Sequence, residues 1–462
     1  MHRSRLTLMQ AKALRLKFHS ILMVIAMTTL MTTPIPSSHS ATTLTSQVRS
    51  ENELRLIAQE FGSVPTDPRG TFQKIHAGSI DDSGDVAFIA TISDPELPSA
   101  ILLSNNNGIQ VILRSGEDSP VGGKYKEFTD LDMTLVQAEG KEENLLLFHA
   151  KLDGGPSPEG IFLWSTDGVQ SLALAGGNSP RGNVYKSFFS LTIASIGNIS
   201  SITRAAYIAL MENGKKSVII KEANRDAVEI LTTGDQIGPL QEVVDDLAIS
   251  KMGWDLGCVV EAHLPGKKKK PFRKVVILDP GFIVSGDALK EGVKFPPLGK
   301  IKQILEPPAI NFQQPFVSIV FKSGASAIAI RDIDGSSEVI AKTGDRVPDL
   351  ANETIQSFGP PVSNGMRGPF GVVAVAGLSD GRAALWMAGF THKVPLEAES
   401  KKLLLIGGSG ISGGQSIVLR SFFPVKLTNK GSLLLRGTIV EGETSREGLF
   451  LLDGLFDDLP PL

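Results

Sequence analysis

The sequence contains few residues of three kinds: cysteine, tryptophan and tyrosine. Cys258 is the only cysteine among 462 residues, so no disulfide can form within the chain and a hydrophobic core must hold the fold. It aligns with the apolar Val86 of the first repeat described below, which favours a small core residue over a reactive thiol. Tryptophan and tyrosine occur three times each. Sugar-stacking faces and protein-binding hot spots are usually rich in both, so their scarcity weakens a lectin interpretation.

Long apolar runs are also scarce. The N-terminal run Ile21–Met31 is well under the roughly 20 residues that span a bilayer, and it follows five basic residues and no acidic one. Small residues at Ser38 and Ser40 suit cleavage before Ala41, so residues 1–40 are predicted to be a secretory signal peptide. An uncleaved N-terminal anchor is the alternative. No later stretch could cross a membrane, so the mature chain is expected to have no transmembrane segment and to be periplasmic or extracellular.

An excess of basic charge is absent as well. The formal net charge is −3 at pH 7, and removal of residues 1–40 takes away five basic groups and no acid, which leaves −8. Phosphate binding needs a net basic face, so nucleic acid is not expected as a partner. Residues 267–270 are four consecutive lysines in a loop between predicted strands. We interpret them as a solvated loop tip, with a site for an anionic partner as the alternative.

What the sequence does contain is a repeat of about 50 to 60 residues. Its clearest copy is 83–116, in which the apolar runs 85–90, 100–103 and 109–113 are separated by a loop and a tight turn. Because one unit cannot bury its own apolar faces, the copies must stack. A glycine closes the third run in each copy, at Gly62, Gly116, Gly176, Gly234, Gly286, Gly344 and Gly407.

The first run of the repeat occurs seven times, at 86–90, 146–150, 205–209, 258–262, 317–321, 372–376 and 433–437. These runs are mostly apolar at every position and are bounded by Gly, Asn or Asp, which is typical of strands buried on both faces. A second short run follows after a loop, and an aromatic segment opens most units, at Phe72, Phe128, Phe188, Phe358 and Phe422. Each unit therefore holds four strands in an up-and-down order.

Seven four-stranded antiparallel units without helical periodicity between them predict an all-β fold, a seven-bladed β-propeller. The last unit ends near residue 454 before a fourth strand can form, while 53–58 supplies an orphan fourth strand. We expect this N-terminal strand to complete the last blade and to leave no open edge. Residues 133–145 and 192–204 exceed the length of a tight hairpin and are expected to be irregular connections.

The predicted domain organisation is a signal peptide (1–40), a disordered leader (41–52), a single propeller (53–456) and a C-terminal tail (457–462).

Three short motifs support a family resemblance: Gly-x-Val-Ala-Phe-x-Ala at Gly84–Ala90, Gly-Ile-Phe-Leu at Gly160–Leu163, and Gly-Asp-x-x-Pro at Gly344–Pro348. Together they resemble the bacterial exported choice-of-anchor tandem-repeat proteins with an NxxGxxxAF motif, over nearly all of residues 53–454. The resemblance implies a propeller-like repeat fold and brings no activity, because that family is functionally uncharacterised. The asparagine of the motif is Asp81 in the first unit.

Polar residues gather at the turn that leaves each fourth strand, namely Glu117, Asp118, Asn178, Asp235, Asp287 and Asp345. In a propeller this turn crosses to the inner strand of the next blade, so we expect these residues to form a ring on one face, around the channel mouth. They are the predicted ligand-binding residues, for a shared cation or a basic ligand. Alternatively, they satisfy backbone N–H groups in turns beside glycine.

Other candidate sites are weaker. His149, Glu261 and Arg436 occupy a strand position that is apolar in other copies, which indicates either a functional site or local hydrogen bonds. The loops at 81–85 and 332–338 resemble calcium loops but lack the ligand spacing of an EF-hand, and the four histidines of the mature chain have no paired metal-ligand spacing. No metal, cofactor or catalytic residue is therefore predicted.

The sequence shows no nucleophile with a base, no Asp-box series as in sialidase-type propellers, and no tryptophan repeats as in quinoprotein propellers. The leading hypothesis is a monomeric exported propeller that serves as a binding or scaffold module for an unknown protein or small ligand at one face. The alternative is a propeller hydrolase or lyase that uses acids of the predicted ring. That alternative requires at least two of Glu117, Asp235, Asp287 and Asp345 to converge within about 5 Å.

Overall fold

The structure is a computed structural model of the whole chain, which divides into Met1–Gln47 and Val48–Leu462. The predicted signal peptide, the predicted leader and the C-terminal tail lie outside the described residues. The described residues are 54–455 apart from 65–66, 95, 97, 139–140, 196–202, 223–224, 238–241, 251, 253–257, 266–270, 280–281, 285–290, 306–308, 312–313, 332–336, 348–349, 351, 365–369, 391–397, 407–409, 413–414, 418 and 442.

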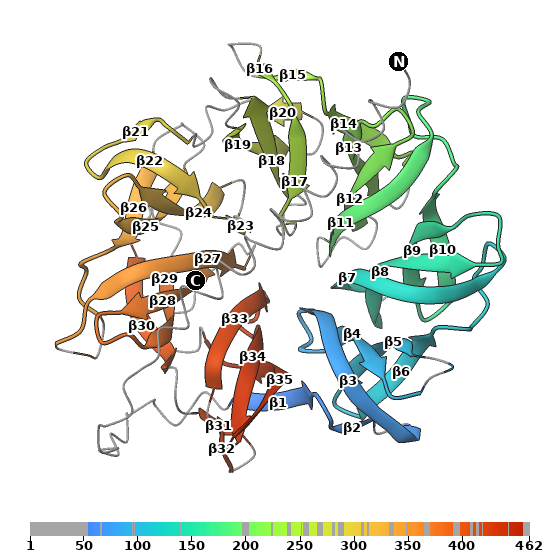
Figure 1. Cartoon of the computed structure of the whole chain (residues 1–462), viewed down its shortest axis with the longest axis horizontal. Coiled ribbons are helices and arrows are strands. Elements are labelled where there is room, and N and C mark those ends of the chain that lie inside the picture. The colour runs from blue at the N-terminus through green and yellow to red at the C-terminus, as the bar shows by residue number, and fades with distance from the viewer. Residues whose placement is uncertain are drawn as a thin grey trace, which may run out of the picture. The chain divides into compact units, whose positions relative to one another are not determined.

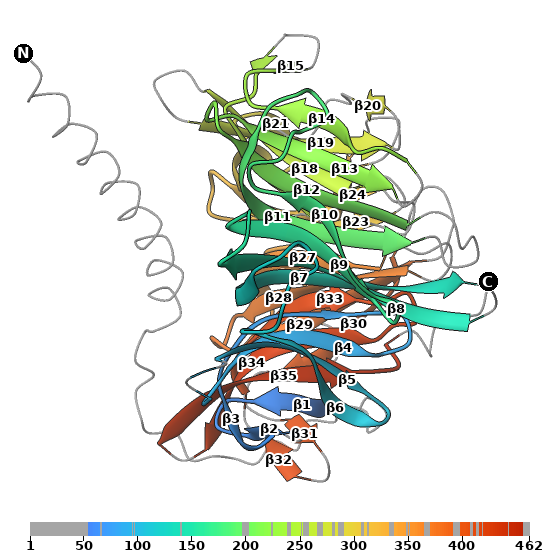
Figure 2. The same ribbon diagram turned by 90° about the vertical axis from the view of Figure 1, so that its right-hand side faces the viewer.

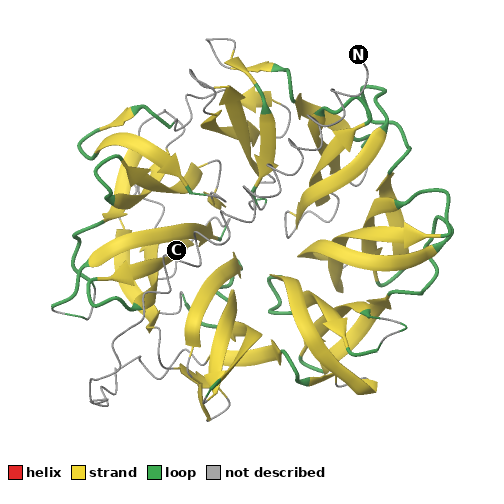
Figure 3. Ribbon diagram, viewed as in Figure 1, coloured by secondary structure: helices red, strands yellow, loops and turns green. Residues whose placement is uncertain are grey.

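Strands are the only regular secondary structure in the described part of the chain (Figure 3). They form nine antiparallel sheets, of which seven have four to six strands; we number these seven in chain order. Sheet 1 contains β2 (Ser63–Val64), β3 (Asp67–Ile80), β4 (Val86–Ile92), β5 (Ser99–Asn105) and β6 (Gly108–Arg114). Sheet 2 contains β7 (Lys124–Ala138), β8 (Lys141–Asp153), β9 (Glu159–Ser165) and β10 (Gly168–Leu174). Sheet 3 contains β11 (Tyr185–Ser195), β12 (Thr203–Met211), β13 (Lys216–Glu222) and β14 (Val228–Thr232).

The remaining sheets follow the same plan. Sheet 4 contains β17 (Asp246–Ile249), β18 (Cys258–Pro265), β19 (Pro271–Asp279) and β20 (Phe282–Val284). Sheet 5 contains β21 (Lys294–Phe295), β22 (Gly299–Ile304), β23 (Ala309–Asn311), β24 (Gln314–Phe321), β25 (Ser326–Arg331) and β26 (Ser337–Lys342). Sheet 6 contains β27 (Ile355–Ser363), β28 (Phe370–Leu378), β29 (Ala383–Phe390) and β30 (Ala398–Ile406), and sheet 7 contains β33 (Leu419–Leu427), β34 (Leu433–Glu441), β35 (Thr444–Leu452) and β1 (Leu54–Gln59). The two small hairpins are β15 (Gln236–Ile237) with β16 (Glu242–Val243), and β31 (Gly410–Ser412) with β32 (Gln415–Ile417).

Sheets 1–7 follow one another around a common centre, as in a β-propeller (Figure 1). In sheets 2, 3 and 6 the first strand in the chain (β7, β11 and β27) lies nearest the centre, and the later strands lie progressively farther out (Figure 1). In sheet 7 the order from the centre is β33, β34, β35 and then β1. Seen from the side, the strands run across the thickness of this ring (Figure 2). The architecture is therefore all-β and propeller-like.

The alternation of side chains along β4 explains why its sequence is apolar at every position. Val86, Phe88 and Ala90 belong to a core cluster with residues of sheet 7, whereas Ala87 and Ile89 belong to a cluster with residues of sheet 2. Because successive side chains of a strand point to opposite faces, a strand between two neighbouring sheets must be apolar on both. The core is thus a series of clusters between adjacent sheets.

The N-terminal strand pairs with the last one, as the sequence predicts. Strand β1 is antiparallel to β35, with Leu54 opposite Leu452 and Leu56 opposite Phe450. Leu54 packs in the cluster between sheets 6 and 7, and Ile57 packs in the cluster between sheets 7 and 1. A strand from one end of the sequence therefore completes a sheet that is otherwise built from the other end.

The prediction of an irregular connection at 133–145 is wrong. Strands β7 and β8 remain paired up to Ala138 opposite Lys141, and they form a long hairpin. Met133 and Val136 are buried on this hairpin, and Glu143 accepts hydrogen bonds from the backbone N–H and the hydroxyl of Thr166. Packing and these hydrogen bonds stabilise the long strands β7 and β8. The spacing of turn residues in the sequence did not indicate this length. Of the second predicted connection, 192–195 and 203–204 are strand, and 196–202 lie outside the described residues.

One backbone turn leads into the first strand of several sheets. In it the N–H of Gly116 donates to the carbonyl of Tyr125, and the N–H of Tyr125 donates to Glu117; Gly176, Gly234, Gly292 and Gly344 make the corresponding bonds. These glycines have φ between 85° and 97°, a left-handed conformation that suits glycine. In the turn that leads into sheet 1 the same position is Phe61, with φ of 63°, and not the predicted Gly62.

Candidate functional site

Two of these turns share five of their ten residues. We call residues 116–125 (GEDSPVGGKY) turn 2, because they lead into sheet 2, and residues 176–185 (GGNSPRGNVY) turn 3. In both, the serine N–H donates to a carbonyl four residues on, at 2.9 Å from Ser119 to Gly123 and 2.6 Å from Ser179 to Asn183. The same backbone frame therefore carries different side chains: turn 2 has Glu117, Asp118 and Lys124 where turn 3 has Gly177, Asn178 and Val184.

A buried carboxylate lies behind turn 3. Glu229 on β14 is 5% exposed, and its carboxylate accepts hydrogen bonds from three hydroxyls. Ser179 Oγ donates to Oε2 at 2.9 Å, and Ser217 Oγ and Thr232 Oγ1 each donate to Oε1 at 2.8 Å. Because Ser179 belongs to turn 3, these bonds fix the turn against the outer strands of sheet 3.

Glu229 is ionised in this setting. Burial raises its pKa, but the hydrogen bonds from Thr232, Ser217 and Ser179 and the charge of Arg181 together outweigh burial, so the pKa lies below its ordinary value of 4.5. The guanidinium of Arg181 donates to the carbonyl of Glu229 at 3.3 Å and forms an ion pair with Asp235 at 3.3 Å. Arg181 therefore has partners within sheet 3 and the turn that follows it.

Two of the three tyrosines of the chain meet beside turn 3. Tyr185 and Tyr207 are 4% and 1% exposed, and their hydroxyls are hydrogen-bonded to each other. Burial raises the pKa of both, so both phenols stay neutral at physiological pH. In turn 2 the corresponding Tyr125 lies among Phe128, Phe148 and Phe162, and its hydroxyl has no hydrogen-bond partner in the described part of the chain.

A cavity of about 430 Å³ opens between the outer strand of sheet 2 and sheet 3. Its walls come from β10, from turn 3, from the tyrosine pair and from the segment that precedes β14. The lining residues are Ser171, Leu172, Ala173, Leu174, Gly177, Asn178, Ser179, Pro180, Tyr185, Tyr207, Asp226 and Ala227. Its size falls in the range of small-ligand sites, and it is the candidate functional site.

The six predicted ligand-binding residues are not drawn together. Asn178 lines the cavity, Glu117 is exposed, and Asp118 is exposed with its carboxylate 3.7 Å from Lys124. Asp235 and Asp345 each accept a hydrogen bond at 2.9 Å from a backbone N–H three residues earlier in their own turns. Asp287 lies outside the described residues.

Turns 2 and 3 also do not lie around a channel mouth, where the sequence led us to expect them. Turns 2 and 3 join an outer strand to the start of β7 or β11, and Figures 1 and 3 show these starts at the outer edge of the ring. The expected ring around a channel mouth is therefore misplaced. Strands β7 and β11, with 15 and 11 residues, cross from the outer edge to the centre (Figure 1), so the start and the end of each lie far apart, which the sequence repeat does not reveal.

His149, Glu261 and Arg436 each have a polar neighbour close at hand. His149 bonds Thr129 Oγ1 through Nδ1 at 2.7 Å and lies 3.5 Å from Glu159 through Nε2, and Arg436 pairs with Glu447. Glu261 lies 3.8 Å from His263. The second oxygen of Glu159 accepts the backbone N–H of Phe188 in sheet 3 at 3.1 Å. His149 and Glu159 therefore join sheets 2 and 3, which supports the local explanation.

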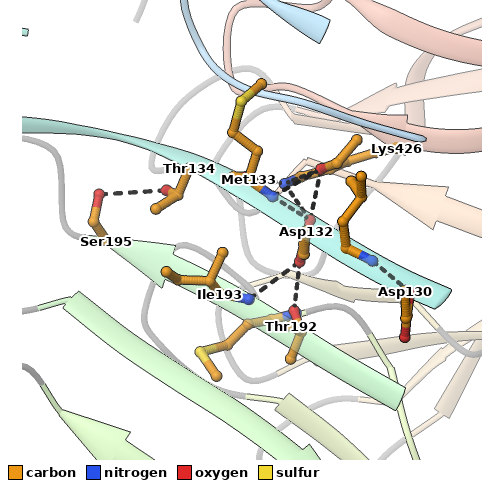
Figure 4. A network of polar contacts seen from close by, with 11 residues as sticks. Asp130, Asp132, Met133, Thr134, Thr192, Ile193, Ser195 and Lys426 are labelled. Atoms are coloured by element: carbon orange, nitrogen blue, oxygen red, sulfur yellow. Dashed lines mark hydrogen bonds and ion pairs between the residues drawn. The ribbon is translucent and has the colours of Figure 1, made fainter. Parts of the chain in front are cut away.

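A second polar cluster lies near the centre (Figure 4). Asp132 is 1% exposed; its Oδ1 accepts from Ser79 Oγ at 2.6 Å and from Lys426 Nζ at 2.9 Å, and its Oδ2 accepts from Thr192 Oγ1 at 2.9 Å. Lys426 Nζ also donates to Ser79 Oγ and to the carbonyl of Met133. One carboxylate thus ties sheets 1, 2, 3 and 7. Each of the three protons of the Lys426 ammonium group has an acceptor. The cluster therefore stabilises the contacts between these sheets.

The described residues contain neither a candidate metal site nor a membrane-spanning helix. Among the described residues, no group of three or more His, Cys, Asp or Glu side chains could hold a metal ion. Within the same residues, no helix is long and apolar enough to cross a membrane.

Sequence reasoning missed Tyr185, Tyr207 and Glu229. Comparison of the repeat copies could have singled out Glu229. It pairs with Ile219 across the strands, and the residues at the same position of the fourth strand are Val111 in sheet 1 and Val339 in sheet 5. A carboxylate in a position that is apolar in other copies needs a specific set of donors. The tyrosines gave no comparable signal, because sheets 1 and 2 also have aromatic residues at these positions, Phe72 and Tyr125 for Tyr185 and Phe88 and Phe148 for Tyr207.

Part of the sequence matches a protein family that has no assigned function. Residues 25–247, slightly less than half of the chain, match DUF7453, a family of unknown function. A search of curated proteins gave no match.

Solved structures resemble the chain only distantly. A lectin from Burkholderia pseudomallei, BP39L, is 12% identical with a TM-score of 0.38, over 83% of this chain and 99% of the lectin. A Trypanosoma rangeli sialidase mutant with trans-sialidase activity is 10% identical with a TM-score of 0.35, over 86% of this chain and 57% of the sialidase. A mutant of the Aleuria aurantia lectin in complex with alpha-methyl-L-fucoside is 9% identical with a TM-score of 0.34, over 74% and 97%. At these scores the similarities identify no ligand for this chain.

Proposed function

We propose that this protein is an exported, seven-bladed β-propeller that acts as a binding module, and that it holds a small ligand in the cavity between sheets 2 and 3. The cavity carries this proposal. It has the volume of a ligand site, it is formed by two sheets, and turn 3, one of its walls, is fixed by the hydrogen bond from Ser179 to the buried Glu229. A wall held in place before binding reduces the ordering that binding would otherwise require.

A scaffold role alone would not need this arrangement. Glu229 is buried where sheets 1 and 5 have valine, and burial of a charge is favourable only when it is paired and hydrogen-bonded. The alternative of a hydrolase or lyase needs carboxylates in pairs. Asp235 is paired with Arg181, and Asp345 with its own turn, so the described predicted acids favour binding over catalysis.

The test blocks the cavity without touching the core. Ser171 is an exposed lining residue on β10, and Gln170 is its exposed neighbour that does not line the cavity. A mixed library of small neutral, cationic and anionic compounds is screened by ligand-observed NMR against the mature chain, Ser171→Trp and Gln170→Trp. We expect compounds that bind the wild type and Gln170→Trp but not Ser171→Trp. The proposal fails if no compound binds the wild type, or if Ser171→Trp binds the same compounds equally well.

A further inference from the structure

We infer that the ligand of this cavity is an uncharged polyhydroxyl compound of about the size of a monosaccharide. The inference rests on the proposed function and deepens it by naming the ligand class. It depends on which lining groups have unused hydrogen-bonding capacity, on the charges around the cavity and on the apolar surface inside it.

Three lining side chains have capacity to spare. The Ser171 hydroxyl, the Asn178 amide and the Asp226 carboxylate belong to β10, turn 3 and the segment before β14, and none of them bonds another described residue. Ser179, by contrast, already donates to Glu229 and accepts from the N–H of Asn183. The free groups offer both donors and acceptors, and a hydroxyl group is itself both a donor and an acceptor.

The charges disfavour an anion. The described lining residues include no Lys, Arg or His, they do include Asp226, and the ionised Glu229 lies directly behind Ser179. The nearby Arg181 is already bonded to Asp235 and to the carbonyl of Glu229. An anionic ligand would therefore meet carboxylates without a free cation to pair with.

The same lining is poorly suited to a cation. Asp226 is the one charged residue among the described lining residues, and it is exposed; an exposed ion pair contributes little to binding. A cation would also leave the donors of Ser171 and Asn178 unused. A ligand with several hydroxyls would use all three groups.

The inner wall suits the C–H face of a sugar-like ring. Leu172 and Ala227 are partly buried, and they pack against the core cluster that contains Tyr185 and Tyr207. Tyr185 and Tyr207 also line the cavity, but at 4% and 1% exposure they offer a ligand little surface, so the apolar contact would come from Leu172 and Ala227. A cavity with an apolar inner wall and polar groups at its edge accommodates a compound with one apolar face and a hydroxylated rim.

The experiment compares ligand classes on the mature chain by titration calorimetry. The neutral probes are methyl α-glucoside, methyl α-galactoside, methyl α-mannoside and myo-inositol; the cationic probes are choline and ethanolamine; the anionic probes are gluconate and lactate. We expect at least one neutral probe to bind with a dissociation constant of about 10 mM or lower. A tenfold increase in salt concentration should leave that constant nearly unchanged, because a neutral ligand is not screened.

Two substitutions locate the binding. Asn178→Ala should weaken the neutral probe about tenfold, whereas Asp118→Ala, at the corresponding position of turn 2, should have no effect. Asp226→Asn keeps an acceptor and should weaken binding only a few fold. Circular dichroism melting of each variant checks that the fold is retained.

The outcomes separate the two proposals. Binding of a cation that is lost in Asp226→Asn and weakened by salt overturns the ligand class and leaves the cavity as a binding site. Binding of a neutral probe that is unchanged in both Asn178→Ala and Ser171→Trp places that probe elsewhere and overturns the inference. If none of the neutral probes binds, the inference fails, and if the mixed library also yields no ligand, the proposed function fails with it.

Discussion

Turns 2 and 3 share a backbone conformation and half of their residues, yet the side chains that pack behind them differ. Tyr125 of turn 2 faces Phe148 and Phe162, while Tyr185 of turn 3 faces Tyr207, whose cross-strand partner is Ile219. These differences come from strands that follow the turns by twenty or more residues. The comparison shows that the turn has the same backbone conformation in both sheets. The side chains of the second, third and fourth strands decide whether an aromatic cluster or a cavity lies beside it.

The largest expected effect comes from removing the carboxylate that distinguishes turn 3. Glu229→Ala leaves three hydroxyls without their acceptor in a buried site, so it should lower the free energy of unfolding by about 3 to 5 kcal/mol. Ser171→Ala, at the corresponding position of sheet 2, should change it by less than about 0.5 kcal/mol. Urea unfolding followed by circular dichroism measures both. Equal effects of the two substitutions would remove the distinction between the turns.

The pH dependence of the same site has a defined sign. Because the pKa of Glu229 is lowered in the folded state, its ionised form stabilises the fold above the ordinary pKa of 4.5, and this stabilisation is lost as the pH falls through the folded-state value. Glu229→Gln lacks this contribution. The stability difference between wild type and Glu229→Gln should therefore shrink as the pH is lowered from 6 to below 4.5. A constant difference over that range would mean that Glu229 has no lowered pKa.

A buried acid with an unused oxygen should behave in the opposite way. Asp81 is 3% exposed; its Oδ1 accepts from Ser83 and Asp85, and its Oδ2 has no hydrogen-bond partner in the described chain. Burial, opposed by the Ser83 hydroxyl and reinforced by the Asp85 charge, raises its pKa to about 6. A raised carboxyl pKa favours folding at low pH, and this advantage is lost as the pH rises from about 4 to about 6.

Asp81→Asn should therefore stabilise the protein at pH 7 by up to about 3 kcal/mol, and by little at pH 4. Sheet 6 already has an asparagine at the corresponding position, where Asn364 Oδ1 accepts the N–H of Gly371. Melting of wild type and Asp81→Asn at both pH values is the measurement. A loss of stability at pH 7 would show that the carboxylate has an interaction that the amide cannot replace.

The turn into sheet 1 gives a third version of the same frame, with a strained residue. Phe61 adopts φ of 63° where Gly116 adopts 86°, and it is 59% exposed, so its side chain gains little from burial. Phe61→Gly should raise the free energy of unfolding by about 1 to 2 kcal/mol, because the left-handed conformation is costly for a residue with a Cβ atom. Gly116→Ala should lower it by about 1 kcal/mol. If Phe61→Gly is destabilising, the phenyl ring has a packing role that its exposure does not indicate.

The smallest effect tests the tyrosines directly. Tyr125→Phe removes a buried hydroxyl without a partner and should stabilise the protein by about 1 kcal/mol, whereas Tyr185→Phe breaks the bond with Tyr207 and should destabilise it by about 1 kcal/mol. One chemical change at two corresponding positions should thus give opposite signs. Differential scanning calorimetry of both variants provides the measurement, and shifts of the same sign would contradict the contrast between the turns.

Much of the architecture could be predicted from the sequence. The apolar run at 86–90 indicated a strand with two buried faces, and β4 packs against both neighbouring sheets. The orphan strand at 53–58 indicated pairing with the far end of the chain, and β1 does pair with β35. Both predictions succeed because burial and pairing constrain every residue along a strand, so the pattern survives substitution in individual copies.

The site could be predicted only in part. The sequence singled out Asn178, which lines the cavity, because polar residues recur at its turn position, but Tyr207 and Glu229 lie on later strands and contact turn 3 only after the sheet folds. The predicted ring of acids failed in its placement because sequence spacing does not show where a long first strand begins in space. The long β7–β8 hairpin was missed for a related reason, since its length depends on packing and not on its turn.

The pairing of β1 with β35 sets an order of events during synthesis. Residues 54 and 452 are about 400 positions apart, so the first strand leaves the ribosome long before its partner exists. Sheets 1 to 6 contain strands that are close in sequence and can form as they emerge, whereas sheet 7 must wait for the end of the chain. Closure is therefore the final step of folding, and a chain terminated before β35 retains an unpaired strand at its beginning, whatever the quality of the sheets between.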